Sequence, residues 1–227
     1  MKATINTILI LAACLLCYFW YMSVHTPIKF DDTRADRESQ VVAHLIQIRN
    51  AQVEYKNANG KYAAQWDSLL IFLKTAKKKE VMKEGSLTEA QLEAGLTEEK
   101  AVKIIRSGKE KDIIANGLQN FKRDTIFTPM IEKLYPGVYT EDNIDSLVIV
   151  PFSGGKQFEL EVNNDYKNSS EIPIPLFEAR TPYESYLGDL NHQLLVNIKD
   201  EAVTLGKYPG LKVGSVEAPN NNAGNWE

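Results

Sequence analysis

The chain has 227 residues, enough for one domain or for one domain with a small appendage, and its soluble part is long enough to bury a hydrophobic core. Its 30 acidic residues outnumber its 26 basic ones, which gives a formal net charge of −4. Nucleic acid is therefore not an expected partner, because phosphate binding depends on clustered Lys and Arg. Both cysteines, Cys14 and Cys17, fall inside the first apolar segment, so the rest of the chain can form no disulfide.

The first apolar segment, Ile5–Val24, is almost unbroken and contains no charged residue. A helix needs about 20 such residues to cross the hydrocarbon core of a bilayer. Tyr18, Trp20 and Tyr21 lie at one end of the segment, where amphipathic rings prefer the headgroup level. We therefore expect a transmembrane signal-anchor over residues 1–26 that contacts the lipid bilayer through Ile5–Val24.

This segment has two other interpretations. A cleaved secretory signal is disfavoured, because its apolar core usually spans only about 7–15 residues. A lipoprotein anchored at Cys14 is an alternative, because Leu11-Ala12-Ala13-Cys14 resembles a lipobox. Against it, the residues after Cys14 are apolar, whereas a lipoprotein normally continues into a polar tether.

The charges on the two sides of the segment nearly balance. Lys2 and the α-amine stand on one side, and Lys29, Arg34 and Arg37 on the other. The short, positive start resembles a secretory n-region, which favours the N-terminus inside. We expect a single-pass protein of the inner (cytoplasmic) membrane with its soluble body extracytoplasmic, in the periplasm.

A second helix is predicted beyond a short juncture. Pro27 should interrupt the helix over His25–Phe30. From Asp32 to Ala58, apolar or semi-apolar residues return every three or four positions, which is typical of an amphipathic helix. Its stripe consists of Val41, Val42, Leu45, Ile48, Ala51, Gln52 and Tyr55. Because such a stripe must be covered, we expect the neighbouring Trp66–Leu73 helix to fold back on it, and any part of the helix Asp32–Ala58 left exposed to bind a protein partner or another copy of the chain.

A shorter, buried helix is expected over Trp66–Lys74, after a stop at Asn59-Gly60. Together these segments form a predicted juxtamembrane helical region, residues 27–79, arranged as a helical hairpin. The basic run Lys77–Lys79 is interpreted as a solvated loop.

Residues 80–217 are predicted to form an α+β soluble body. Short helices joined by glycine turns are expected first, with a capping box at Ser86–Glu89 and a helix from Thr97 to about Arg106. The later expectations are strands at Thr125–Met130, Ser146–Pro151 and Gln157–Val162, with a hairpin turn at Ser153–Lys156, and a helix over Tyr183–Leu205. Near Ile172–Ala179, Pro173 and Pro175 allow either an edge strand or no strand. The Asn/Gly-rich tail, residues 218–227, should have little to pack except Trp226.

The region around residues 41–75 resembles the segment that follows the membrane helix in type IV pilins and pseudopilins. The residues that carry this resemblance are Leu45, Ile48, Arg49, Ala51, Gln52, Tyr55, Asn59, Gly60, Tyr62, Leu69 and Leu73. The chain lacks the Gly-Phe or Gly-Met prepilin peptidase site and the glutamate five residues into the apolar segment. The resemblance therefore implies a similar build, and it gives no support to pilin processing or filament incorporation.

The whole chain more closely resembles a group of single-span envelope proteins of Bacteroidetes bacteria. This resemblance extends to the closing segments Tyr208–Ser215 and Pro219–Trp226. It implies a location in the cell envelope and implies no activity.

Candidate residues for chemistry are few, because the chain has no zinc-protease, nucleophile-elbow, phosphate-loop or dinucleotide motif. The one constellation is Glu184, Asp189 and His192, which could share a metal or a proton if they faced one way. The plainer interpretation is the polar flank of an amphipathic helix. We therefore expect no catalytic, metal or cofactor-binding residue, and replacement of Asp189 by Asn or His192 by Ala should change stability by less than about 0.5 kcal/mol.

The sequence thus predicts an α+β protein with an N-terminal transmembrane helix, a juxtamembrane helical hairpin and a distal body with a small antiparallel sheet and helices. The expected function is a non-enzymatic, membrane-anchored envelope component that acts through protein–protein contacts, as a structural or pseudopilin-like assembly part. The alternatives are an envelope module that binds glycan or peptide and, more weakly, a metal-assisted hydrolase.

Overall fold

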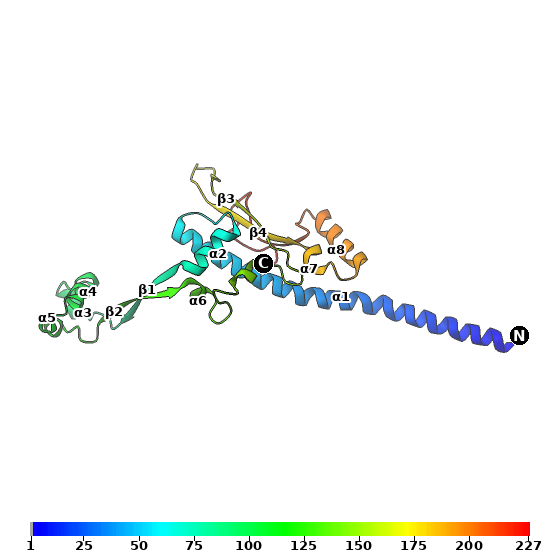
Figure 1. Ribbon diagram of the computed structural model, residues 1–227, viewed down its shortest axis with the longest axis horizontal. Coiled ribbons are helices and arrows are strands. Elements are labelled where there is room, and N and C mark those ends of the chain that lie inside the picture. The colour runs from blue at the N-terminus through cyan, green and yellow to red at the C-terminus, as the bar shows by residue number, and fades with distance from the viewer. Residues whose placement is uncertain (1) are drawn as a thin grey trace. The chain divides into compact units, whose positions relative to one another are not determined.

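The computed structural model describes residues 2–227 and contains helices and two small antiparallel sheets (Figure 1). The α+β class is confirmed, as is the long apolar helix at the N-terminus. The chain divides into two compact units. Unit 1 comprises residues 1–72 and 142–227, and unit 2 comprises residues 73–141. The predicted body, residues 80–217, is therefore shared between the two units.

Unit 1 is built on one continuous helix, α1 (Lys2–Asn59), that includes Pro27. The prediction that Pro27 would interrupt the helix over His25–Phe30 was wrong. A proline inside a helix removes one hydrogen bond and crowds the carbonyl four residues earlier, at a cost of about 3 kcal/mol. That cost is local, and Phe30, only 5% exposed, packs on the rest of unit 1 in the very next turn. The packing of the following turn holds the helical path.

The predicted stripe on this helix forms the centre of the unit 1 core. Val41, Leu45, Ile48 and Ala51 have no exposed surface. They are covered within the chain, because α1 contacts two strands of a three-stranded sheet and the 3₁₀ helix η1 (Ile144–Val148). Burial of this apolar stripe supplies the driving force that α1 lacks from helix propensity alone.

The three-stranded sheet has the order β3 (Glu159–Asn163), β4 (Leu176–Pro182), β5 (Gly210–Gly214), and both pairings are antiparallel. On β4, Phe177 and Ala179 are fully buried. The ring of Phe177 lies 4.7 Å from that of Tyr62, which follows α1 in the chain. The sheet therefore packs against both α1 and the turn at its end.

The helix α2 (Trp66–Thr75) confirms the second helix expected from the sequence. It starts in unit 1, where the Trp66 indole N–H donates to the Phe158 carbonyl oxygen at 2.9 Å. The rings of Tyr55 and Phe72 meet edge to face at 5.1 Å. These contacts close the end of the α1 stripe.

Gln52 is the one fully buried polar residue of the α1 stripe. Its side-chain amide accepts from the Ala63 N–H and donates to the Ala63 carbonyl oxygen, both at 3.0 Å. We expect Gln52→Ala to lower the free energy of unfolding by about 2–3 kcal/mol, because it leaves two buried backbone groups unpaired. Chemical denaturation of the full chain in detergent would measure this loss. The exposed Gln40→Ala is the matched control, and equal effects at both positions would contradict the role assigned to Gln52.

Two strand predictions in unit 1 need correction. Residues Ser146–Pro151 do not form a strand: most of them belong to η1, followed by a single bridge from Ile149 to Gln157. The 3₁₀ turn buries Ile144, Leu147 and Val148 together, whereas a strand would turn alternate residues outward. Near Ile172–Ala179 an edge strand or no strand was expected, yet β4 is central, because its two preceding prolines lie outside the ladder and Pro182 ends it.

The helix predicted over Tyr183–Leu205 is divided into α7 (Tyr183–Leu187) and α8 (His192–Thr204). Asn191 caps α8, since its side-chain oxygen accepts from the Leu194 N–H at 3.1 Å. This cap starts a new helix and leaves a turn at residues 188–191. The turn is central to the site described below.

The C-terminal tail packs more closely than expected. The Gly214 N–H donates to the Ala223 carbonyl and the Asn225 N–H to the Lys212 carbonyl, both at 3.0 Å, and a bridge joins Val213 to Gly224. Arg49 of α1 holds Glu227 at 2.7 Å. The prediction of a loosely packed tail was wrong, because asparagine and glycine here supply the polar contacts and turns of an added edge.

Unit 2 is a two-stranded ribbon with a small helical part. The strands β1 (Lys77–Glu84) and β2 (Lys122–Pro129) pair antiparallel along their whole length. The strand expected at Thr125–Met130 is confirmed as β2. Residues Lys77–Lys79, which were expected to form a solvated loop, are the start of β1. Between the strands lie α3 (Glu89–Glu93), α4 (Glu98–Ser107) and α5 (Glu110–Ala115), and α6 (Met130–Leu134) follows β2.

The helical part of unit 2 has its own core of Leu96, Ala101, Leu118 and Phe121. Thr97 caps α4 as predicted. The capping box, however, is formed by Thr88 and Gln91 rather than by Ser86 and Glu89.

Candidate membrane-proximal interaction site

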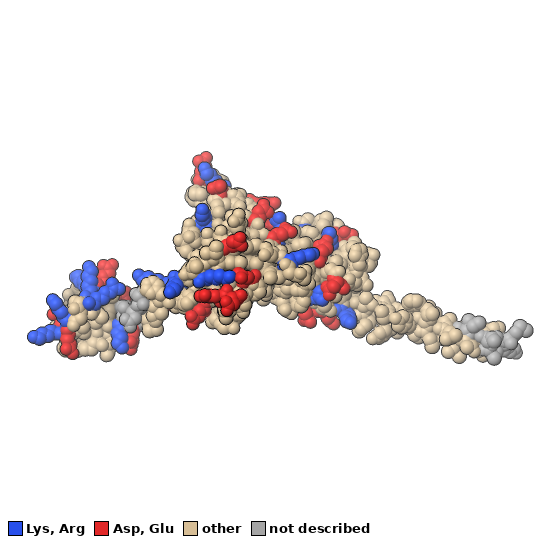
Figure 2. All heavy atoms as spheres, in the orientation of Figure 1, with Lys and Arg blue, Asp and Glu red and all other residues tan. Residues whose placement is uncertain are grey.

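The apolar start of α1 leads directly into a polar cluster of unit 1. The helix has an 18-residue window of mean hydropathy 2.0 in which no residue is buried, so by length and composition it could cross a membrane. On the face shown in Figure 2 this part of α1 is free of Lys, Arg, Asp and Glu where it is described. In Figure 1, α7 and α8 lie beside α1 on the side of the body nearest to this segment. The membrane-proximal cluster, as we call it, comprises α1 residues 22–38, α7 and the 188–191 turn.

Arg37 fastens the 188–191 turn to α1. Its guanidinium binds both carboxylate oxygens of Asp189, at 2.8 Å for the Nη2–Oδ2 contact, and donates to the Tyr186 carbonyl oxygen at 2.7 Å. The same guanidinium lies 5.0 Å from the centre of the Phe152 ring. Arg37 therefore joins three segments that are far apart in the chain.

Arg34 and Glu38 extend this cluster by one turn of α1. They form an i,i+4 ion pair at 2.8 Å, and Arg34 lies 5.4 Å from the centre of the Tyr183 ring. The hydroxyl of Tyr186, a fully buried residue, donates to Glu38 at 3.4 Å. Burial raises the pKa of the Tyr186 hydroxyl above its ordinary value. The group is thus a neutral hydrogen-bond donor at all physiological pH values.

The three residues that the sequence offered for metal or proton chemistry are not brought together. Glu184 pairs with Lys199 on α8, and Asp189 pairs with Arg37. His192 is the exposed first residue of α8. Within residues 2–227, as far as side chains are described, no three His, Cys, Asp or Glu gather closely enough to hold a metal ion. The two acids therefore act as ion-pair partners inside unit 1.

The Arg37–Asp189 pair changes what is expected of substitutions in the turn. The hydrogen bond from Arg37 lowers the pKa of Asp189 below its ordinary value. A lowered pKa stabilises the fold above the unfolded-state value of about 3.9, and this stabilisation is lost as the pH falls through the folded-state value. Because Asp189 is 62% exposed, we expect Asp189→Asn to cost about 1 kcal/mol or less at neutral pH.

The free energy of unfolding, measured as a function of pH on the acid side, checks this expectation. In Asp189→Asn, the free energy of unfolding should fall less steeply below about pH 4 than in the wild type. His192→Ala, beside the same turn, should leave this pH dependence unchanged. Identical profiles for wild type and Asp189→Asn would show that the pair contributes nothing. The earlier expectation of no effect at Asp189 treated it as an unpaired helix flank.

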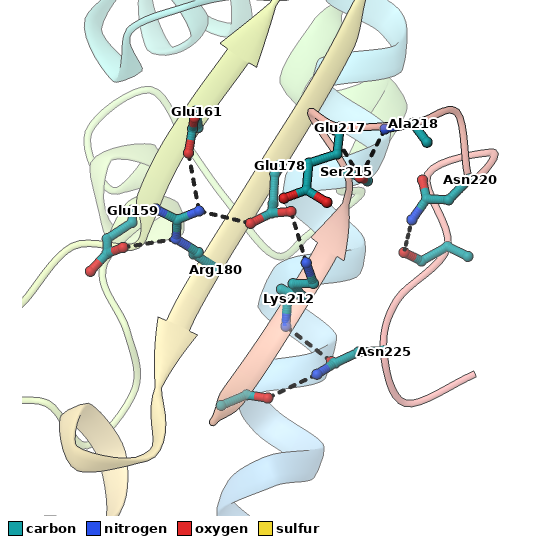
Figure 3. Close-up of polar contacts among 12 residues, drawn as sticks. Glu159, Glu161, Glu178, Arg180, Lys212, Ser215, Glu217, Ala218, Asn220 and Asn225 are labelled. Atoms are coloured by element: carbon teal, nitrogen blue, oxygen red, sulfur yellow. Dashed lines mark hydrogen bonds and ion pairs between the residues drawn. The ribbon is translucent and has the colours of Figure 1, made fainter. Parts of the chain in front are cut away.

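A second charged cluster lies on the three-stranded sheet (Figure 3). Arg180 of β4 binds Glu159 and Glu161 of β3 at 3.0 Å each, and Glu178 at 2.9 Å. Lys212 of β5 binds the other oxygen of Glu178 at 3.0 Å. The bond to Glu178, more than any other contact, holds the pKa of Arg180 above its usual range.

This sheet cluster serves to join the strands. Glu178 is only 4% exposed, and each of its carboxylate oxygens contacts a cation, so it offers no oxygen for proton transfer. Burial, followed by the nearby charge of Glu159, raises the pKa of Tyr208 to about 12, so this hydroxyl is also neutral. The geometry links β3, β4 and β5 in one register and presents no reactive group.

Unit 2 contains a hollow of about 770 Å³ among its short helices. Its lining combines apolar residues such as Leu96 and Ile104 with Lys100 and Lys103. The Lys100 ammonium donates to the Gly95 carbonyl oxygen at 2.9 Å. This hollow is open, and its lining is part apolar and part polar.

Comparison with known proteins adds no relative. No protein-family model matches the chain, and neither a curated protein nor a solved structure matches it.

Sequence reasoning identified Asp189 and Glu184 but not their partners. The Arg34–Glu38 pair could have been found, because residues four apart on a helix are neighbours. The Arg37–Asp189 pair spans 152 residues, and only the folded topology brings it together. The burial of Glu178 could not be predicted either. In the sequence, an acidic residue at that position of an alternating strand is expected on the exposed face.

Proposed function

We propose that this chain is a single-pass membrane protein of the cell envelope that holds an extracytoplasmic body at the inner membrane and acts through protein–protein contacts. It is a non-enzymatic structural or assembly component, built somewhat like a pseudopilin. The observation that carries the proposal is the continuity of α1. One helix provides both the exposed apolar segment and the central stripe of the unit 1 core.

The arrangement of charges supports a role in contacts rather than in chemistry. Glu184, Asp189 and Glu178 are each held by a cation, and the buried tyrosine Tyr186 is a neutral donor. A partner would meet the face of α1 opposite the buried stripe. The exposed residues of that face include Asp32, Ala35, Asp36, Ser39, Gln40, Ala43 and Asn50.

Protease added to spheroplasts tests the topology. We expect the body to be digested from outside while Ile5–Val24 remains in the membrane fraction, because an uncleaved apolar helix of this length is stable in lipid. If the body resists the protease until the membrane is lysed, the orientation is the opposite of the one proposed. Mass spectrometry of the N-terminus is the control for the alternative anchor: a lipid-modified Cys14 as first residue would replace the helix by a lipoprotein anchor.

A binding module for glycan or peptide is a second candidate, and the hollow in unit 2 favours it. Affinity purification from membranes after crosslinking separates the two. A stable protein partner crosslinked through α1 supports assembly. Crosslinks confined to peptide or glycan material near Lys100 and Lys103 support the binding module.

A further inference from the structure

The 188–191 turn forms a groove with α1 at the end of the apolar segment. The groove has a volume of about 260 Å³, and both sides of it belong to unit 1. Its lining includes Met22, His25, Lys29 and Phe30 of α1, with Leu190 and Asn191 of the turn. Met22, Phe30 and Leu190 supply the apolar part of the lining, Thr26 and Thr33 complete it, and Lys29 is an exposed cation.

The position of this groove along α1 determines which molecule is beside it. A helix rises about 1.5 Å per residue, so Lys29 lies about 7 Å beyond Val24. The headgroup layer on each side of a hydrocarbon core about 30 Å thick is about 5–8 Å deep. If Ile5–Val24 spans the bilayer, Lys29 and the turn stand at the level of the lipid phosphates.

We propose that this groove binds the phosphate of a phospholipid headgroup in the anchoring bilayer. The inference rests on the proposed membrane anchor. Lys29 and the positive N-terminal end of the 13-residue helix α8 face the phosphate. Met22 and Leu190 contact the glycerol and the first acyl carbons.

The Arg37–Asp189 pair gives this contact its rigidity. It fastens the turn to α1 two helical turns beyond Lys29, so the groove is formed before any lipid enters. A preformed site loses little conformational entropy on binding. The body therefore sits on the bilayer surface through the 188–191 turn instead of standing off on a bare helix.

Two photoreactive lipids test this proposal with the full chain in phosphatidylethanolamine nanodiscs. A probe with its reactive group in the acyl chain reports the anchor, and one with its reactive group on the headgroup reports the groove. We expect acyl-chain crosslinks within Ile5–Val24 and headgroup crosslinks on residues 188–193. Lys29→Glu should lower the headgroup yield at 188–193 about tenfold, the factor expected for one lost charge-assisted hydrogen bond. Lys61→Glu is the same charge reversal beyond the other end of α1 and should leave the yield unchanged.

The outcomes separate the two proposals. Acyl-chain crosslinks in the segment without headgroup crosslinks at 188–193 would overturn the groove and keep the anchor. An unchanged yield in Lys29→Glu would overturn phosphate recognition. Absence of acyl-chain crosslinks would overturn the anchor, and the groove with it.

Discussion

Replacing Leu45 by alanine should lower the free energy of unfolding by about 2–5 kcal/mol, the range measured for truncating a fully buried leucine. Leu45 has no exposed surface and lies midway along the α1 stripe that the sheet and η1 cover. Removing its three outer carbons leaves a cavity, because packed elements on opposite sides cannot both move inward. Denaturation of the full chain in detergent, followed by tryptophan fluorescence, measures the change.

The matched control for Leu45 is an exposed leucine just after the last residue of α8. Leu205, at the end of α8, is 61% exposed, and Leu205→Ala should change stability by less than about 0.5 kcal/mol. If Leu45→Ala left the unfolding transition unchanged and weakened association between copies instead, the stripe would belong to an interface. The intramolecular packing described above would then not be its main role.

Glu178→Gln is expected to cost about 2–4 kcal/mol. The substitution keeps the shape of the side chain but removes the charge of a nearly buried carboxylate that binds both Arg180 and Lys212. Arg180 keeps its contacts with Glu159 and Glu161, so the loss should stay below that of an isolated buried pair. Equilibrium unfolding at neutral pH is the measurement.

Glu161→Gln provides an unusually close comparison. Glu161 also binds the Arg180 Nη1 atom, at 3.0 Å against 2.9 Å for Glu178, yet its side chain is 54% exposed against 5%. We expect Glu161→Gln to cost about 1 kcal/mol or less, as for other exposed pairs. Similar losses for both variants would mean that burial does not determine the strength of these contacts.

The helical part of unit 1 was largely predictable because it depends on periodicity. The α1 stripe repeats every three or four residues, and the burial of Val41, Leu45 and Ile48 follows from that repeat. The elements that pack on this stripe could not all be predicted from the sequence. The sequence suggested the neighbouring helix α2, whereas β4, β5 and η1 contribute as well, from residues about 100 to 170 positions later.

The missed elements share a different physical cause. β1 reads as a run of lysines, and only its pairing with β2 makes it a strand. Residues Ser146–Val148 have the composition of a strand but fold as a 3₁₀ turn, because tertiary packing overrides a weak β preference. The membrane-proximal cluster depends on Arg37 and Asp189, which no local pattern connects.

The unbroken passage of α1 through Pro27 also limits how a partner can approach. Because α1 has no break there, unit 1 cannot rotate about the helix axis independently of the apolar segment. If Ile5–Val24 spans the bilayer, the rotation of the anchor helix fixes the direction in which the body faces, and residues 25–59 extend about 50 Å along the helix axis. A protein that docks on the body would then have to match both its distance from the apolar segment and its rotation about the helix axis. Inserting one residue into α1 near Pro27 would rotate the body by about 100°.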